Sequence, residues 1–425
     1  MRPANSPPSR PALLLALLTA INFLNYIDRQ ALFAVFPLIQ AEIGLTDAEL
    51  GLLASAFILV YMVCAPLAGY FGDRIRRLPI VMVSVSLWSV FTVFTGLARD
   101  FVHLLISRAG VGVGESAYAP VSSAMIADSF PENRRGSRLA VFNLAVPVGS
   151  ALGYVLGGLL GSWFGWRAAF AVVGVPGLVL ALGCCFFTEP MRGAQDLASP
   201  TQPKSNARAL FSNPVYLATC GAMAALTFVL GALAAWLPTF LVRIHGFSVA
   251  SAGAAFGSLT VMSGLVGTGV GGVLGDILRR RHRAGYLWIS ATGLLLAAPA
   301  TWIAIQADDP VTFWIAAALA ETLVFLNTGP LNAVIVNVAR PEIRATAVGA
   351  NVLFIHLFGD ALSPWLVGAL SDRVGIRSAL GITPPVLIAA GILCLVAGKF
   401  LNASGAGSVE RALDRNGCSK NAGAP

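Results

Sequence analysis

Seven ionisable side chains lie within apolar stretches long enough to cross a membrane, where an uncompensated charge is costly. They are Asp28, Arg29, Arg108, Glu115, Glu321, His356 and Asp360. A charge at bilayer depth costs at least ~2.5–3.5 kcal/mol, so each of them needs an opposite charge, a hydrogen bond or a wet cavity. Carboxylates in such a setting can carry protons, and cations can hold an anionic group.

Asp28 and Arg108 are predicted to lie at matching depths. Asp28 is eight residues from the outer end of the segment 12–36, and Arg108 is seven residues into the segment 101–129. At 1.5 Å per residue these positions are roughly 12 Å and 10 Å deep. We therefore predict that the two residues form an ion pair or share one substrate, and a purely structural pair is the alternative.

Glu115 follows Arg108 by seven residues and returns to nearly the same helix face, roughly 21 Å deep. No cation is expected at its own level, and an isolated carboxylate in an apolar environment favours its protonated form. We predict Glu115, together with Asp28, as the proton-coupling site. Arg29 points roughly 100° away from Asp28 on the helix and either locks a helix interface or touches substrate.

The second half of the chain has a similar but sparser set of polar side chains. His356 and Asp360 are one helical turn apart and within hydrogen-bonding reach of each other. They are predicted to bind substrate, and bracing a kink near Pro364 is the alternative. Glu321 lies near the middle of the segment 311–338, where it is predicted to gate or to bond a neighbouring helix.

The composition indicates that these side chains are positioned by membrane helices. The 425 residues are 56% hydrophobic and 11% charged, against roughly 25% charged in soluble domains. We predict an all-α integral membrane protein with twelve spans of roughly 20 residues or more. The spans are 12–36, 48–71, 79–98, 101–129, 137–160, 166–187, 214–240, 249–278, 285–306, 311–338, 344–370 and 379–401.

The distribution of positive charge predicts the orientation of the chain. Of the 28 Lys and Arg residues, 21 fall in the termini and the predicted inner loops. Arg29 and Arg108 lie within helices, and only five fall in the predicted outer loops: Arg99, Arg167, Arg243, Arg373 and Arg377. This asymmetry predicts that both termini are cytoplasmic in a multi-pass cell membrane, such as a bacterial inner membrane. The net charge of +8 therefore indicates membrane topology rather than a nucleic-acid partner.

A loop motif occurs twice, 203 residues apart. The two copies are Gly69-x-x-Gly72-Asp73-x-x-Arg76-Arg77 and Gly272-x-x-Gly275-Asp276-x-x-Arg279-Arg280, with a fainter echo at Gly368-x-x-Ser371-Asp372-Arg373. The repeat predicts two pseudo-symmetric six-helix bundles, 1–188 and 213–402. A cytoplasmic linker is predicted at 189–212 and a disordered tail at 403–425.

The duplicated loop resembles the signature of the major facilitator superfamily, whose members rock two six-helix halves about a central site. Arg76 replaces the glycine usual at its position in that signature. We predict a gating or structural role for one set of residues: Arg29, Gly72, Asp73, Arg74, Arg77, Asp128, Pro147, Gly149, Gly153, Asp276, Arg279 and Glu321. Pro147, Gly149 and Gly153 are similar to the antiporter motif of the superfamily; proton antiport, symport and facilitated movement all remain open.

Four stretches resemble the spinster branch of that superfamily. They are Asn25-Tyr-Ile-Asp-Arg29, Arg108-Ala-Gly-Val-Gly-Val-Gly-Glu-Ser-Ala-Tyr118, the glycine-rich run from Ala145 to Gly158, and His356-Leu-Phe-Gly-Asp360. The branch implies an amphipathic, anionic, lipid-like substrate and, in several members, proton coupling. The expected substrate-binding residues are Arg108, Asp28, Tyr26, Tyr118, His356 and Asp360.

Other classes are less well supported by the sequence. Small organic anions or hydrophobic drugs are the alternative substrates. An enzyme is disfavoured, because the sequence has no His-Glu-x-x-His or Gly-x-Ser-x-Gly motif, and ATP-driven transport is disfavoured, because it has no Walker motif. A channel or receptor is not distinguished by residues alone. The six cysteines have no metal-binding spacing. We expect no cofactor and no metal; the expected partners are substrate, protons and membrane lipids, with the chain a monomer.

Overall fold

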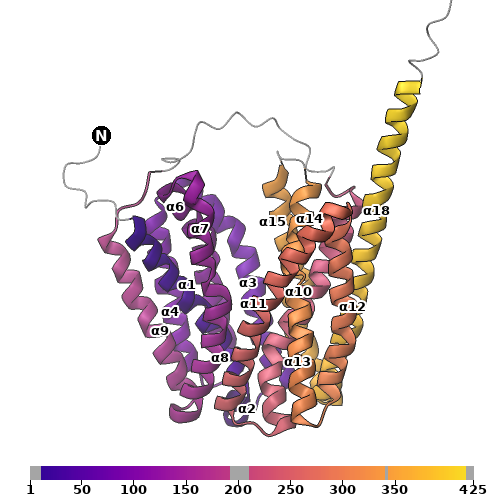
Figure 1. Cartoon of the computed structure of the whole chain (residues 1–425). Coiled ribbons are helices and arrows are strands. Elements are labelled where there is room, and N and C mark those ends of the chain that lie inside the picture. Colours follow the sequence, from indigo (N-terminus) through magenta and orange to yellow (C-terminus); the bar gives the residue numbers. More distant parts are fainter. Residues whose placement is uncertain (1–10, 192–209, 340–342, 418–425) are drawn as a thin grey trace, which may run out of the picture. The chain divides into compact units, whose positions relative to one another are not determined.

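The computed structural model describes residues 11–191, 210–339 and 343–417, and all regular secondary structure in these ranges is helical (Figure 1). The α-helices of the first part are α1 Pro11–Ala34, α2 Phe36–Ile43, α3 Asp47–Arg74, α4 Arg77–Gly96, α5 Phe101–Ser116, α6 Tyr118–Ser129, α7 Glu132–Asn143, α8 Ala145–Phe164 and α9 Trp166–Gly183. A short 3₁₀ segment, η1, covers Cys184–Phe186.

The remaining helices follow the predicted linker. They are α10 Pro214–His245, α11 Val249–Arg281, α12 Gly285–Gln306, α13 Pro310–Phe325, α14 Thr328–Val338, α15 Arg344–Ile355, the π segment η4 His356–Asp360, α16 Ser363–Val374, α17 Ile376–Leu380 and α18 Thr383–Gly417. The predicted linker 189–212 lies largely outside the described residues. The tail predicted from 403 is helical as far as Gly417, and 418–425 lie outside the described residues.

Eleven helical segments of the described chain are long and apolar enough to cross a membrane. The twelfth predicted span, 101–129, is not among them. Its residues form α5 and α6, which are 16 and 12 residues long and meet at Ala117. The all-helical membrane class is thus confirmed, and the count of twelve spans remains a prediction.

Three interruptions divide the long helices, and two of them fall beside predicted functional residues. The break at Ala117 follows Glu115 by two residues, and α13 and α14 are separated at Leu326 and Asn327. The third interruption is the π segment η4, which begins at His356. Broken helices and π segments often mark functional sites in membrane proteins, because they free backbone groups and redirect side chains.

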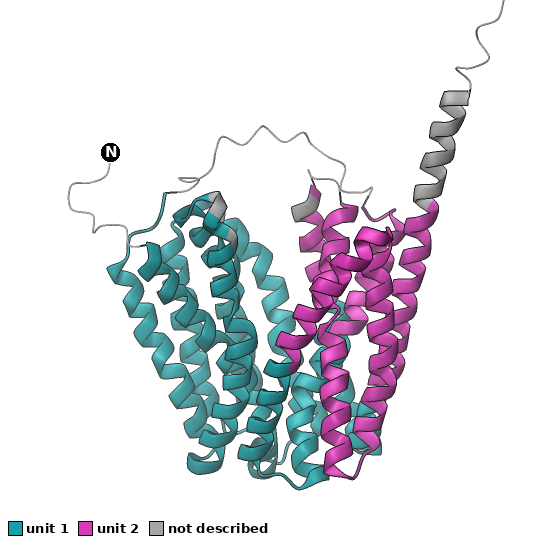
Figure 2. Cartoon of the chain, viewed as in Figure 1, with its two compact units in different colours: residues 1–201, 228–262, 356–382 teal, residues 202–227, 263–355, 383–425 magenta. Residues whose placement is uncertain are grey.

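The chain divides into two compact units, which Figure 2 shows in different colours. Unit 1 comprises Met1–Thr201, Phe228–Met262 and His356–Ile382, and unit 2 comprises Gln202–Thr227, Ser263–Ile355 and Thr383–Pro425. These units do not follow the predicted boundary between the two bundles, because parts of α10 and α11, and all of α16, belong to unit 1. The predicted bundles, 1–188 and 213–402, therefore remain a prediction.

Unit 1 is held together by close helix packing. In it α1 packs on α8, α4 packs on α5 and α9, and α3 packs on α5 and α16. Glycines allow α8 to approach α1: a Cβ atom at Gly149 would lie 3.1 Å from the carbonyl oxygen of Phe23, and one at Gly153 would lie 2.6 Å from that of Ile27. Such contacts favour small residues at membrane helix interfaces. Pro147 lies half-buried near the start of the same helix.

Unit 2 is built around α12, which packs on α13 and α18. Tyr216 in α10 donates a hydrogen bond of 2.7 Å to the carbonyl oxygen of Ala347 in α15. Glu321 in α13 is buried, with 7% of its surface exposed. Asn327 is fully buried at the break between α13 and α14, and its amide donates to the carbonyl oxygen of Leu323 at 2.7 Å.

Candidate functional site

The Arg29–Glu115 ion pair corrects one of our predictions. Arg29 Nε donates to Glu115 Oε2 at 2.6 Å, and the Glu115 side chain is completely buried. The prediction that Glu115 has no adjacent cation was therefore wrong. It assumed that Arg29 points away at its own depth, whereas the long guanidinium side chain reaches Glu115 from α1 to α5. In the described part of the chain, Glu115 Oε1 has no hydrogen-bond partner.

The predicted Asp28–Arg108 pair is confirmed. Arg108 Nη1 lies 3.7 Å from Asp28 Oδ1, and both side chains are at most 2% exposed. The Thr92 hydroxyl donates to Asp28 Oδ2 at 2.5 Å. Among the described residues, Arg108 Nε and Nη1 have no hydrogen-bond acceptor, and Asp28 Oδ1 has no donor. Buried polar atoms are nearly always satisfied, so these donors are candidates for contact with a ligand.

Three aromatic rings surround the Arg29 guanidinium. Its carbon atom lies 5.3 Å, 4.9 Å and 5.1 Å from the ring centres of Tyr26, Phe57 and Tyr61. Phe57 is also 5.0 Å from the guanidinium of Arg108. Cations over aromatic faces are attracted by the negative ring face. Tyr26 is thus beside the ion pairs, and its role in substrate binding stays a prediction. Our sequence reasoning missed Phe57 and Tyr61, because aromatic residues in an apolar span resemble ordinary lipid-facing or core residues.

His356 and Asp360 form the predicted contact. His356 Nδ1 lies 2.9 Å from Asp360 Oδ1, and the two side chains are 28% and 20% exposed. The His356 ring centre is 6.5 Å from that of Tyr61, so η4 is next to α3 within unit 1. The two residues span a π turn rather than an α turn, so the pair is part of a helix distortion. This is compatible with the alternative that the pair braces a kink near Pro364.

Tyr118 does not face the ion pairs. It is 1% exposed, its hydroxyl donates to the carbonyl oxygen of Leu18, and its ring packs against Trp88 and Phe142. The structure therefore places Tyr118 in the hydrophobic core of unit 1, and we do not carry it into the proposed substrate site. Its position three residues after Glu115 is misleading, because the helix is broken at Ala117.

The first loop motif forms a latch between helices. Arg77 forms an ion pair with Asp128 at the end of α6, and its Nε donates to the carbonyl oxygen of Gly72 at 3.4 Å. A Cβ atom at Gly72 would lie 2.9 Å from Val121, so this glycine permits the approach of α3 to α6. Arg74 stacks on the ring of Tyr70. The side chain of Asp73 lies outside the described structure.

The second loop motif is held differently. Tyr286 donates a hydrogen bond of 2.6 Å to Asp276, while Arg279 and Arg280, the counterparts of Arg76 and Arg77, are exposed. Position 331, which follows Asp128 by the 203 residues that separate the two motifs, is Leu. The predicted Asp–Arg latch is therefore replaced here by a tyrosine–carboxylate bond, because the sequence lacks the second acidic partner.

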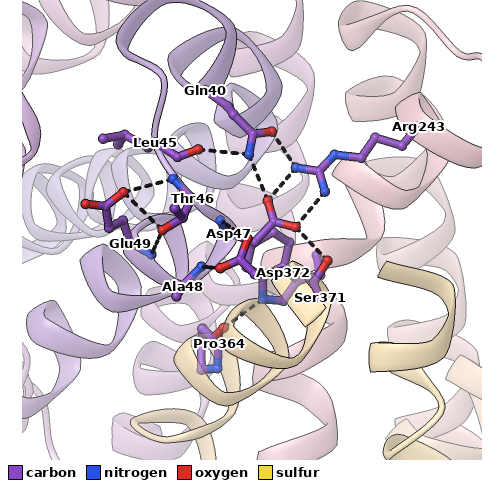
Figure 3. Close-up of polar contacts among 11 residues, drawn as sticks. Gln40, Leu45, Thr46, Asp47, Ala48, Glu49, Arg243, Pro364, Ser371 and Asp372 are labelled. Atoms are coloured by element: carbon purple, nitrogen blue, oxygen red, sulfur yellow. Dashed lines mark hydrogen bonds and ion pairs between the residues drawn. The ribbon is translucent and has the colours of Figure 1, made fainter. Parts of the chain in front are cut away.

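A polar cluster that the sequence analysis did not identify joins α3 to α10 and α16 in unit 1 (Figure 3). The Asp47 carboxylate accepts from Arg243 at 2.6 Å and 2.7 Å, from the Ser371 hydroxyl at 2.6 Å and from Gln40. The Asp372 carboxylate accepts the backbone N–H groups of Asp47 and Ala48, each at 2.8 Å. The helix N-terminus favours this negative charge.

Two signals in the sequence point to this cluster. Thr46 and Glu49 form a capping box at the start of α3, which fixes the helix end beside Asp47. The echo of the loop motif supplies Ser371 and Asp372. Arg243, however, lies 196 residues from Asp47, and no local pattern reports a pair of that sequence separation.

The central residues form an electrically balanced group with two features useful for transport. Two carboxylates, Asp28 and Glu115, face two guanidiniums, Arg29 and Arg108. Each pair has at least one buried polar atom without a partner among the described residues. Such a group can take up a proton on a carboxylate and an anion on a guanidinium. The part of the chain that the structure describes has no group of three or more His, Cys, Asp or Glu residues that could hold a metal ion.

Similarity to known proteins identifies the family of the chain. The pattern of the Major Facilitator Superfamily matches residues 18–364. Human protein spinster homolog 1 is 35% identical over 393 residues, covering 86% of this chain and 74% of the relative. The sphingosine-1-phosphate transporter SPNS2 of Danio rerio is 32% identical over 388 residues, covering 86% and 77%.

A solved structure agrees with this assignment. It is a bacterial homologue of the human lysosomal transporter spinster in an inward-facing, unoccupied conformation, with a TM-score of 0.86 and 26% identity, covering 92% of this chain and 98% of the other. A D-xylose–proton symporter shares the fold, with a TM-score of 0.72 and 16% identity. Confirming the resemblance seen in the sequence, the chain belongs to the major facilitator superfamily and, within it, to the spinster family of transporters.

Proposed function

We propose that this spinster-type transporter moves an amphipathic, anionic, lipid-like substrate across the membrane by proton-coupled alternating access. The observation that carries the substrate class is the buried Arg108. Its guanidinium retains two donor atoms without acceptors in the described structure, beside the ring of Phe57. An anionic headgroup would satisfy those donors, and planar guanidinium groups suit phosphate and carboxylate oxygens.

Proton coupling is assigned to Glu115, with Asp28 as a second candidate. Protonating Glu115 would break the charge balance of its pair with Arg29 and leave a cation beside the aromatic rings. A cation released in this way changes both the affinity for an anion and the packing of α1 on α5. The direction of transport, and the choice between antiport and symport, are decided by the assay below.

Alternating access is assigned to the latches at helix ends. The Asp47–Arg243–Asp372 cluster connects α3, from the first predicted half, to α10 and α16, from the second. This cluster would break when the halves separate at that end of unit 1. The Arg77–Asp128 pair would act within the first half at the other end of α3. We further propose a monomer with both termini cytoplasmic.

A ligand screen followed by transport tests the proposal. The unfolding temperature of the purified protein in detergent is measured by thermal shift in the presence of each ligand. The ligands are lysophospholipids, sphingoid phosphates, sugars and small organic acids. We expect saturable stabilisation by single-chain anionic lipids, and at least a tenfold weaker response in Arg108→Ala, which loses a charge-assisted contact. Stabilisation by small hydrophilic acids alone would overturn the lipid assignment and favour organic anions.

Transport in liposomes then tests the coupling. Uptake of the stabilising lipid is measured with pH gradients of either sign and as counterflow without a gradient. Acceleration by a gradient of one sign shows coupling and its direction. Saturable counterflow distinguishes a carrier from a channel, and activity of the purified protein alone counts against a receptor. An uptake rate that is unchanged by a pH gradient of either sign would refute proton coupling.

A further inference from the structure

A groove between α4 and α5 of unit 1 lies apart from the ion pairs. Its volume is about 470 Å³, and it is lined mainly by Phe91, Phe94, Leu97, Arg99, His103 and Ile106 of α4, α5 and the connection between them. That volume falls in the roughly 300–1,000 Å³ range of small-molecule sites. We propose that this groove binds an anionic glycerophospholipid of the surrounding membrane, with an acyl chain on the aromatic wall and the phosphate at Arg99.

The depth of the groove suits a lipid rather than a soluble ligand. Phe91 lies five residues before the end of α4, and Ile106 lies five residues after the start of α5. At 1.5 Å per residue the groove therefore extends about 8 Å from the helix ends, which is about a quarter of the hydrocarbon thickness. Phe94, Leu97 and Ile106 are more than half exposed at its rim, where an acyl chain would cover them.

The charge at the mouth of the groove favours an anionic headgroup. Arg99 has no hydrogen-bond or ion-pair partner in the part of the chain that is described. The neighbouring Asp100 is already engaged, because its carboxylate accepts the backbone N–H of His103 at 2.9 Å and contacts the His103 ring at 2.9 Å. The guanidinium therefore remains available, and it suits bidentate contact with phosphate.

The packing of α4 against α5 forms the groove. The ring of Phe91 lies directly over Gly110, where a Cβ atom would collide with it. Phe91 and Phe94 are in contact, with ring centres 6.3 Å apart. On the side of these helices that faces α1, Thr92 and Arg108 hold Asp28. A bound lipid would thus brace the two helices that position the buried ion pair, without touching it.

Native mass spectrometry of the full-length protein tests the site. Delipidated protein is exposed to equal amounts of phosphatidylglycerol and phosphatidylcholine, and the retained lipids are counted. We expect preferential retention of phosphatidylglycerol, lowered about tenfold by Arg99→Gln, the effect of losing one charge-assisted contact. Removal of the aromatic rim in Phe94→Ala should lower retention of both lipids. Arg281→Gln, which removes an exposed arginine elsewhere, should change neither.

Three results would overturn the proposal. Equal retention of both lipids, insensitive to Arg99→Gln, would indicate ordinary annular lipid. Loss of preference in Arg281→Gln but not in Arg99→Gln would place the anionic site elsewhere. Displacement of phosphatidylglycerol by a single-chain lysolipid, with the same dependence on Arg99, would assign the groove to a lysolipid instead of a membrane lipid. All variants change exposed side chains, so folding is checked by thermal unfolding.

Discussion

Replacing Asp372 with asparagine should loosen the contact between α16 and the first turn of α3. The carboxylate accepts two backbone N–H groups, from Asp47 and Ala48, each at 2.8 Å. Asparagine retains one acceptor oxygen and loses the charge. A hydrogen bond to a charged group contributes about 1.5–3 kcal/mol, and a charge at a helix N-terminus about 0.3–1 kcal/mol. Because Asp372 is exposed, the lower part of this range applies.

We therefore expect a loss of about 1–2 kcal/mol, which corresponds to roughly a 5- to 30-fold shift between the latched and open states. Spin labels at Ala41 in α2 and Val374 in α16, in a variant without native cysteines, would report the shift as a larger population at long distance. The matched control is Asp309→Asn. Asp309 caps α13 through the backbone N–H of Thr312 at 2.8 Å, entirely within its own turn.

The control variant should leave the distance distribution unchanged. If Asp372→Asn also leaves it unchanged while the protein remains folded, the cluster does not hold these helices together, and our interpretation of it as a latch is wrong. A shift of equal size in both variants would indicate general destabilisation rather than loss of the latch.

Three further predictions concern the interior of unit 1. Glu115→Gln should abolish acceleration by a pH gradient while counterflow persists, because an amide takes up no proton at this position; full gradient-driven transport would contradict its role. Asp28→Asn should lower the free energy of unfolding by about 3–5 kcal/mol, because it leaves Arg108 buried and unpaired. Thermal unfolding should show that the double variant Asp28→Asn/Arg108→Gln recovers part of this lost stability. Gly153→Val should prevent folding, because its Cβ would lie 2.6 Å from a carbonyl oxygen of α1. The control Gly69→Ala has open space around the added Cβ and should yield normal amounts of monodisperse protein.

Hydropathy was sufficient to predict the all-helical membrane class and eleven of the twelve spans. Long apolar segments specify helices because no other structure satisfies the backbone in lipid. The helix breaks were not predicted: one lies at Ala117, one at Leu326 and Asn327, and one at the π segment η4. Such a break depends on packing against neighbouring helices, and a sequence window does not report that packing.

Depth along a helix predicted one ion pair and missed the other. Asp28 and Arg108 were matched because both lie at similar distances from one membrane face. Arg29 was assigned to its own level, although its side chain is long enough to reach Glu115 at a deeper level. The rise per residue gives the height of a Cα atom. The ion pair depends instead on the position of the guanidinium group at the end of a long, flexible side chain. The Asp47–Arg243 contact was missed for a different reason, because the two residues are brought together only by the tertiary fold.

The ring of Phe57 gives the two central arginines a shared neighbour, 4.9 Å from the guanidinium carbon of Arg29 and 5.0 Å from that of Arg108. Displacing either cation changes the electrostatic environment of the ring and hence of the other cation. Any free energy by which an anion at Arg108 alters proton binding at Glu115 must be matched by an equal effect of the proton on the anion, because linkage between binding sites is reciprocal. The two ion pairs thus share one aromatic contact, although they have no hydrogen bond in common.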